Sequence, residues 1–346
     1  MVWRLTNSTP FAAEYTFARD KDGAEVGLVV VKGTFTIDPQ GVPIAAKDQV
    51  PVVVSPEYVG EPGQSSLRYD WDFPLSKQTT DVLLNGHAYA PGGKTAPQVE
   101  VRMKVGPIDK ALRVVGDRRW QKNWLGYAST DPIPFAKMPI VYERAFGGGD
   151  MNQRHGWDGR NPVGTGFTRD SDKVEALALP NIEFPGDTMS SWKSRPRPAG
   201  FGAIPPNWEP RVKYAGTYDE RWEQERFPLL PRDFDHRFNQ CAPPDQQPPS
   251  FLRGGVAVEL HNLTPGGLLR FQLPRVVLGL ATDIAGQTLN HPAVLYTVIV
   301  EPDFPRVVLV WHSAVACKNK AQRVTRTRIW EKDWVALGDT APDDEE

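Results

Sequence analysis

Proline occupies 33 of the 346 positions in this chain, and glycine occupies another 30. Proline has no backbone N–H to donate and its ring clashes with the preceding helical turn, so this density excludes long helices over most of the chain. Hydrophobic residues nevertheless make up 40% of the sequence and charged residues 24%, which is typical of a globular protein. We therefore expect short strands joined by shaped loops.

Charge and cysteine content exclude several classes of protein. The net charge of −2 argues against a protein that is held to nucleic acid by phosphate contacts. Cys241 and Cys317 form no CxxC pattern, which predicts two inert thiols in a reducing compartment. The N-terminal residues lack the pattern of a signal peptide, and no run of about 18 apolar residues predicts a membrane-spanning helix. We expect a cytoplasmic protein that binds neither nucleic acid nor a membrane.

Alternating residues predict strands in the first third of the chain, residues 1–128. From residue 99 to residue 105, valine or methionine alternates with a charged residue, and a period of two indicates a strand with one buried face and one wet face. Residues 29–37 alternate in a similar way. Their wet face is expected to carry Lys32, Thr34 and Thr36.

The rest of the chain divides into two parts and a tail. Residues 129–249 keep no sustained apolar period, although 170–179 and 218–227 each predict a short helix. Residues 250–338 return to strands, and 293–300 and 307–311 are apolar on both faces, as in central strands that are covered on both sides. Residues 339–346 form an acidic tail. We predict a single mainly β domain over 1–338, with sandwich-like antiparallel sheets, a long irregular loop-rich insert and a few short helices.

The strongest candidate for a functional segment is residues 142–167, which contain seven of the glycines. It is not a phosphate or dinucleotide loop, because Gly147-Gly148-Gly149 leads to Asp150 and no helical apolar stripe follows. One interpretation is a loop folded against its own protein through Arg144, Asp150 and Asp158. The other is an ordered surface loop that a partner protein binds. On the second interpretation, which we take as the prediction, the partner surface includes Tyr142, Arg144, Asp150, Arg154, His155, Trp157 and Arg160.

Two other clusters have alternative chemistries. Asp233 and His236 lie three residues apart with a second carboxylate between them, a set that can bind a metal or act as acid and base, or simply form a salt-bridged corner. Trp71 lies between Asp70 and Asp72, which suits either a sugar-binding face or a packed tryptophan on a strand. No HExxH, paired Cys/His spacing or GxSxG elbow occurs. The sequence therefore predicts no metal site, no cofactor and no catalytic residue.

Several segments of the chain match those of a family of bacterial proteins. The chain resembles one of the numbered domain-of-unknown-function families found in gene clusters of the bacterial type VI secretion system, beside genes for the VgrG spike, PAAR tip proteins and toxic effectors. The matching segments are residues 3–12 (WRLTNSTPFA), 81–91 (DVLLNGHAYAP), 142–148 (YERAFGG), 161–164 (NPVG), 179–183 (LPNIE), 200–211 (GFGAIPPNWEPR), 215–219 (AGTYD), 230–235 (LPRDFD), 242–246 (APPDQ) and 288–289 (TL).

This resemblance implies an adaptor or chaperone, a protein that holds an effector toxin in the cytoplasm and helps to load it onto the VgrG spike. A PAAR tip protein is a further candidate partner. The family has no established catalytic residues to carry over, so we expect a non-enzymatic protein. The alternatives are a hydrolase that uses the cluster of Asp233 and His236, and a carbohydrate-binding β-sandwich module.

Overall fold

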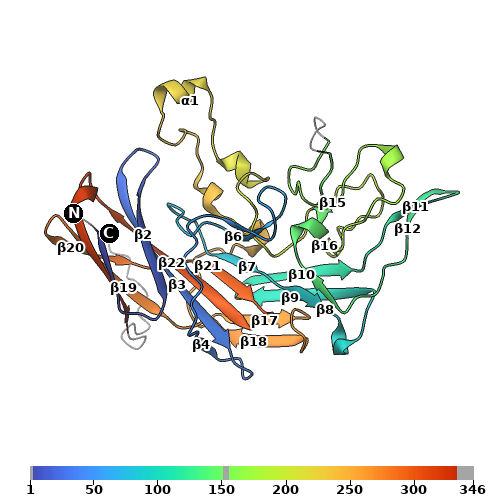
Figure 1. The fold of residues 1–346 in the computed structure, drawn as a ribbon, viewed down its shortest axis with the longest axis horizontal. Helices are drawn as coiled ribbons and strands as arrows, with labels where there is room; N and C mark the ends of the chain where they lie inside the picture. The colour runs from blue at the N-terminus through green and yellow to red at the C-terminus, as the bar shows by residue number, and fades with distance from the viewer. Residues whose placement is uncertain (1–2, 151–155, 333–346) are drawn as a thin grey trace.

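The computed structural model describes residues 3–150 and 156–332. Strands dominate these ranges, and α1 (Glu220–Glu225) is the only α-helix in them. The expected mainly β fold with a few short helices is confirmed (Figure 1). None of the described helices is long and apolar enough to cross a membrane. The 3-10 helices are Pro91–Gly93, Tyr142–Arg144, Ser171–Lys173, Arg211–Tyr214, His236–Asn239, Pro244–Gln246 and Ala321–Arg323.

A six-stranded sheet lies at the centre of the molecule (Figure 1). Its paired strands run antiparallel except for β21 and β7, which run parallel. Strands from the beginning and the end of the sequence therefore lie side by side in one sheet. In order, they are β2 (Ala12–Arg19), β3 (Glu25–Ile37), β22 (Arg306–Ala316), β21 (Val294–Glu301) and β7 (Asp81–Leu84), with β4 (Pro43–Ala45) also paired to β3.

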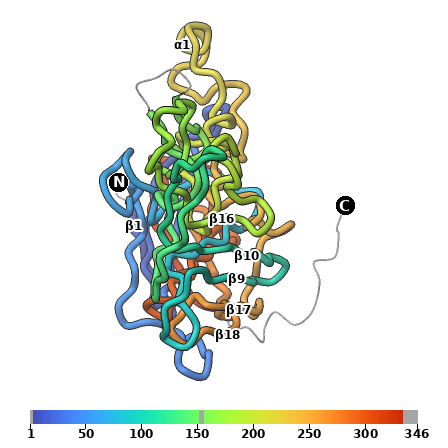
Figure 2. Tube along the Cα trace, turned by 90° about the vertical axis from the view of Figure 1, so that its right-hand side faces the viewer, coloured from blue at the N-terminus to red at the C-terminus, as the bar shows by residue number. Residues whose placement is uncertain are grey.

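Two further sheets flank the central one on opposite sides in Figure 1. The first has five strands, which Figure 2 shows stacked in the order β16 (Ile182–Glu183), β10 (Ile108–Val115), β9 (Gln98–Val105), β17 (Ala257–His261) and β18 (Leu268–Gln272). The second has four strands in the order β1 (Arg4–Asn7), β23 (Val324–Lys332), β19 (Val277–Ile284) and β20 (Gln287–Pro292). In that sheet β1 and β23 run parallel.

One hydrophobic core connects the three sheets. It contains Val31 and Leu309 of the central sheet, Val101 of the five-stranded sheet and Leu280 of the four-stranded sheet. The alternation from 99 to 105 is confirmed, because all four apolar side chains of β9 are buried and the residues between them are not. The burial of both faces along β21 and β22 is confirmed as well.

The wet face expected for residues 29–37 is wrong at two of its three positions. Lys32 and Thr34 of β3 are buried, and Thr36 is exposed. The reason is that residues 46–73 pass over this face of the sheet. Lys32 donates to the carboxylate of Asp72 at 2.8 Å, and the hydroxyl of Thr34 accepts from the backbone N–H of Val50 at 2.9 Å. A buried ion pair therefore replaces water along this part of the strand.

Residues 129–249 form an irregular cover, which lies above the sheets in Figure 1. The helix expected in 170–179 is only a 3-10 helix at Ser171–Lys173, while the one expected in 218–227 is α1. A largely buried ion pair between Arg211 and Asp70, 2.9 Å apart, holds the cover to the chain beneath it. Short pairs complete the fold: β5 (Glu57–Tyr58) with β6 (Leu67–Tyr69), β8 (His87–Tyr89) with β13 (Lys137–Pro139), and β14 (Phe146–Gly147) with β15 (Thr165–Gly166).

A hairpin of β11 (Trp120–Asn123) and β12 (Gly126–Ser129) extends from one end of the molecule, beyond the five-stranded sheet (Figure 1). Its base is anchored because the ring of Trp120 is buried. The backbone of Trp120 also exchanges hydrogen bonds with Leu177 and Ala176 of the cover. The base of the hairpin is thus packed against the cover, while its tip extends into solvent.

Candidate functional site

The glycine-rich segment 142–167 is shaped by its backbone. Its strands β14 and β15 pair in parallel and bring the two ends of the segment together. Gly147, Gly148 and Gly149 all have positive φ angles, of +150°, +75° and +119°. A Cβ atom on Gly148 would lie 2.1 Å from the carbonyl oxygen of Gly164. Only glycine therefore fits at this crossing of two backbone segments.

Side chains inside the segment hold this shape. The buried amide of Asn161 donates to the carbonyl oxygens of Tyr142 and Phe146, at 2.7 and 3.0 Å. Asp158 accepts two hydrogen bonds from the guanidinium of Arg160, at 2.9 and 2.6 Å. Gly156 accepts from the backbone N–H of Asp150 at 2.9 Å. The described part of the segment is therefore ordered by its own hydrogen bonds, as a preformed binding surface requires.

The residues predicted for a partner surface have different positions. Tyr142 is only 5% exposed, packs edge-on against Trp208 and donates to the carbonyl oxygen of Gly202. Its placement on the surface is therefore wrong: the ring supports the segment from below, and burial raises the pKa of its hydroxyl. Arg154 and His155 lie outside the described residues. Those that reach the surface are Arg144, Asp150, Trp157 and Arg160.

Two adjoining hollows lie beside the glycine-rich segment, with volumes of about 660 and 1030 Å³, and they share Thr165 and Ala178. Five glycines of the segment line the larger hollow: Gly147, Gly149, Gly156, Gly164 and Gly166. The smaller hollow is lined by three arginines, Arg118, Arg119 and Arg144, and by Thr130 at the base of the hairpin β11–β12. The glycine-rich backbone and the base of the hairpin thus form two walls of one groove.

The side chains of Asp233, Asp235 and His236 do not converge on one site. Asp233 accepts from the backbone and hydroxyl of Thr217, at 3.0 and 2.7 Å, and Asp235 pairs with Arg237 at 2.6 Å. These hydrogen bonds hold the pKa of both carboxyls below their usual values. His236 contacts Ser76 instead, with 2.8 Å between Nδ1 and Oγ. Across residues 3–150 and 156–332, no three His, Cys, Asp or Glu side chains are placed to hold a metal ion.

The carboxylates beside Trp71 are also engaged elsewhere. Asp70 pairs with Arg211 and Asp72 pairs with Lys32, both in buried or nearly buried surroundings. Burial raises the pKa of Asp72, and Lys32 acts against this rise. Trp71 is partly exposed and lies 6.3 Å from the ring of Phe73. The exposed ring is therefore present, while the neighbouring carboxylates are committed to ion pairs with Lys32 and Arg211.

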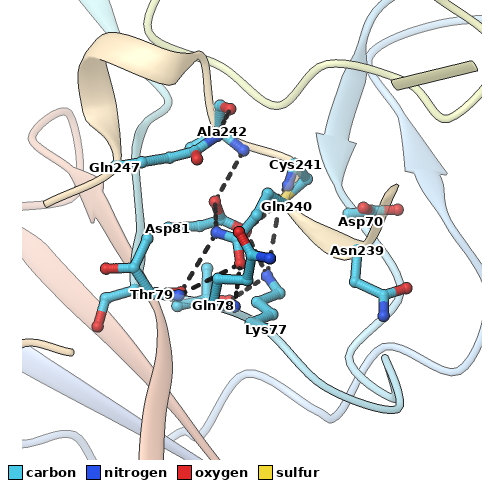
Figure 3. Close-up of polar contacts among 12 residues, drawn as sticks. Asp70, Lys77, Gln78, Thr79, Asp81, Asn239, Gln240, Cys241, Ala242 and Gln247 are labelled. Atoms are coloured by element: carbon cyan, nitrogen blue, oxygen red, sulfur yellow. Dashed lines mark hydrogen bonds and ion pairs between the residues drawn. The ribbon is translucent and has the colours of Figure 1, made fainter. Parts of the chain in front are cut away.

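A cluster of buried polar groups surrounds Asp81 (Figure 3). Its carboxylate accepts hydrogen bonds from Lys77, from the amide of Gln240 and from the backbone N–H groups of Cys241 and Ala242. Burial lowers the pKa of Lys77, but Asp81 together with other nearby groups outweighs burial, so the pKa is raised. Burial raises the pKa of the Cys241 thiol, and Asp81 adds to the rise. The thiol is held protonated and the carboxylate accepts hydrogen bonds on both oxygens, so we interpret the cluster as a structural contact between β7 and residues 240–242.

Both cysteines match the prediction of inert thiols. Cys241 and Cys317 are free and buried. Burial raises the pKa of Cys317 as it does that of Cys241. Neither thiol is thus in the electropositive, accessible surroundings that a reactive cysteine requires.

A third hollow, of about 330 Å³, lies apart from the groove. Three of the segments that carry the family resemblance line it. Segment 81–91 contributes Asn85 and His87, segment 142–148 contributes Tyr142, and segment 200–211 contributes Gly202. Nδ1 of His87 lies 2.6 Å from a carboxylate oxygen of Asp303 on the same wall. These segments therefore meet in space although they lie far apart in the sequence.

Sequence reasoning missed the tip of the hairpin β11–β12. Trp124 and Leu125 stand there between Asn123 and Gly126, and both side chains are highly exposed. Part of the signal was present, because asparagine is favoured at the first position of a β-turn and glycine at the fourth. This tip and the groove at its base are two candidate surfaces for a partner.

Comparison with known proteins gives one result. No curated protein and no solved structure matches the chain. Residues 22–312 match the model of a family described as an uncharacterized protein conserved in bacteria (DUF2169). This match spans most of the 346 residues and includes most of the central sheet, the cover and the groove. The chain therefore belongs to this family of bacterial proteins.

Proposed function

We propose that the protein is a non-enzymatic adaptor or chaperone that binds a type VI secretion effector toxin in the cytoplasm and helps to load it onto the VgrG spike. The resemblance of the chain to proteins encoded in type VI secretion clusters supplies the biological setting. The observation that carries the proposal is the groove beside the glycine-rich segment, whose shape is fixed by its own hydrogen bonds.

The groove suits a polypeptide better than a small molecule. Pockets for small ligands usually have volumes of about 300–1,000 Å³, whereas this groove consists of two adjoining hollows of about 660 and 1030 Å³. Glycine backbone and charged side chains such as Arg119, Arg144 and Lys173 line it. Its rigid wall lowers the entropy that binding would cost. Trp157 and Arg160 on the segment are of the residue types that contribute most to protein interfaces.

Co-purification with the effector encoded beside this chain tests the proposal. The wild-type protein is expected to retain the effector, and Trp157→Ala is expected to lose it while its melting temperature stays close to that of the wild type. Trp330→Ala is the matched control, because Trp330 is 36% exposed and Trp157 is 37% exposed. Trp330 lies on β23 of the four-stranded sheet, and the control should bind normally. Failure of the wild-type protein to retain the effector would contradict the proposal.

One observation keeps the hydrolase as a second candidate. Ser76 and His236 lie within hydrogen-bonding distance, and a histidine next to a serine is the arrangement that activates a serine nucleophile. The two carboxylates of the cluster bond to Thr217 and Arg237 rather than to His236, so neither orients the imidazole. We expect no turnover of p-nitrophenyl acetate. Turnover abolished by both Ser76→Ala and His236→Ala would replace the adaptor with the hydrolase.

A further inference from the structure

The tip of the hairpin β11–β12 displays the two most exposed large hydrophobic side chains among the described residues. Trp124 is 90% exposed and Leu125 is 76% exposed. The turn is ordered, because the side chain of Asn123 accepts from the backbone N–H of Leu125 at 2.9 Å and Gly126 supplies a φ of +125°. An ordered turn that presents tryptophan and leucine together is a typical anchor for another molecule.

The base of the hairpin opens onto the smaller hollow of the groove, which is lined by Arg118, Arg119 and Arg144. Two carboxylates also line this hollow; both oxygens of Glu143 and one oxygen of Asp117 accept hydrogen bonds from the protein. Glu143 accepts from the backbone and the hydroxyl of Ser66, at 2.8 and 2.7 Å. One oxygen of Asp117 accepts from both Arg144 and Asn181, at 3.1 and 2.9 Å.

Two of the three arginines, in contrast, retain unused donors. No described residue accepts a hydrogen bond from the exposed guanidinium of Arg119. Arg144 uses only Nη1, which donates to Asp117 and Asn181. Arg118 is engaged within the protein, because its Nη2 lies 2.9 Å from a carboxylate oxygen of Glu183 and donates to the carbonyl oxygen of Pro180. The free donors are therefore those of Arg119 and Arg144. The hollow therefore offers guanidinium donors, and carboxylates are the protein groups that pair with them best.

We propose that the hairpin tip and this hollow together bind an acidic, extended segment of the effector. Its carboxylates would pair with Arg119 and Arg144, and an apolar patch of the effector would cover Trp124 and Leu125. The strand rise of about 3.3 Å per residue separates Trp120 from Trp124 by roughly 13 Å, the span of about four extended residues. This inference rests on the proposed function for the identity of the partner, and on the hairpin and hollow alone for its chemistry.

The observations favour a protein over a membrane surface. Only two apolar side chains stand at the tip, whereas a membrane-bound element needs a broad apolar face. The arginines lie at the base of the hairpin beside Asp117 and Glu143, away from the tip that would meet the lipid. A flat anionic surface therefore cannot contact the tip and the hollow as an extended peptide segment can.

Titration of the full-length effector into the full-length protein tests the inference. Trp124→Ser combined with Leu125→Ser should raise Kd about tenfold or more without lowering Tm, because neither side chain is buried. Arg119→Glu should raise Kd by a similar factor and weaken its dependence on salt, because it replaces an attraction by a repulsion. Ile44→Ser is the control, since Ile44 is exposed on β4 of the central sheet and should bind like the wild type.

The outcomes separate the inference from the proposed function. Binding by the wild type and undiminished binding by both variants would overturn this inference and leave the adaptor proposal in place. No binding by the wild type would overturn both. Binding of the wild type to vesicles of phosphatidylserine and phosphatidylcholine that is lost on changing Trp124 and Leu125, with effector binding unchanged, would assign the tip to a membrane and overturn the inference.

Discussion

Asp81 connects the start of β7 to residues 240–242 of the cover through both of its carboxylate oxygens. Its partner Lys77 is also buried, so the pair lies where an uncompensated charge is most costly. Buried ion pairs of this kind contribute little as intact pairs but a great deal when one partner is removed. Replacing a single residue of this cluster should therefore lower the stability of the contact between β7 and the cover.

Asp81→Asn should lower the free energy of unfolding by about 3–5 kcal/mol, because it leaves the Lys77 ammonium buried and unpaired. The change keeps the volume of the side chain, so lost packing does not explain the effect. Urea denaturation measures it. Asp109→Asn is the control, because the pair of Asp109 with Arg102 is exposed and screened by water. Equal unfolding midpoints for the two variants would show that the cover does not depend on Asp81.

Two histidines make stability depend on pH. Burial lowers the pKa of His291 to about 4, and burial together with Lys77 lowers that of His312 to about 3. An unfolded histidine titrates near pH 6.5. As the pH falls from there toward 4, the unfolded chain gains protons that the folded protein does not, so stability present above pH 6.5 is progressively lost.

The urea midpoint should therefore fall between about pH 7 and pH 5, above the range in which carboxylates titrate. His312→Phe should flatten this dependence, because phenylalanine can keep the stacking on Tyr296, with ring centroids 4.6 Å apart, and does not titrate. An unchanged slope in that variant would mean that His312 is protonated in the folded protein or accessible to water.

At the scale of elements, the positions of strands could be predicted from the alternation of apolar and polar residues. Which strand faces are buried under other segments of the chain could not. The alternation in β9 predicted its buried face correctly, because the residues between the apolar ones reach solvent. The similar alternation in β3 failed because Lys32 pairs with Asp72, 40 residues away. Periodicity does not distinguish a lysine in water from a lysine buried against a carboxylate.

The candidate site shows the same limit. Glycine content identified the segment 142–167, since dense glycine requires an unusual backbone whatever surrounds it. The burial of Tyr142 depends on Trp208 and Gly202, which are distant in the sequence. The groove depends on the hairpin β11–β12 lying beside residues 174–179 of the cover. These contacts are tertiary, and no local pattern encodes them.

Gly148→Ala tests the loop as an element. The substitution places a Cβ atom 2.1 Å from a carbonyl oxygen at a φ of +75°, so it should destabilise the protein and weaken effector binding. Gly63→Ala separates the two costs, because Gly63 has a φ of +77° with no atom within 4 Å of the added Cβ. It should show only the left-handed backbone cost of roughly 1–2 kcal/mol. Equal losses of melting temperature in both variants would argue against the close crossing at Gly148.

At the scale of the whole molecule, the two faces of the central sheet have different roles. One face contributes to the apolar core that the three sheets share. The other lies beneath segments held by buried ion pairs, among them Lys32 with Asp72 and Lys77 with Asp81. A rigid β scaffold with shaped loops on one side is the usual way to present a binding surface. The groove and the hairpin lie at the edge of this cover.

Secretion of the effector that the proposal assigns as the partner tests the central proposal most directly. The effector and the VgrG spike would be measured in the culture medium of the parent strain and of a strain that lacks only this gene. The adaptor proposal predicts that the deletion strain still exports the spike but no longer exports the effector, and that a wild-type copy of the gene restores export. Undiminished export of the effector by the deletion strain would contradict the proposal.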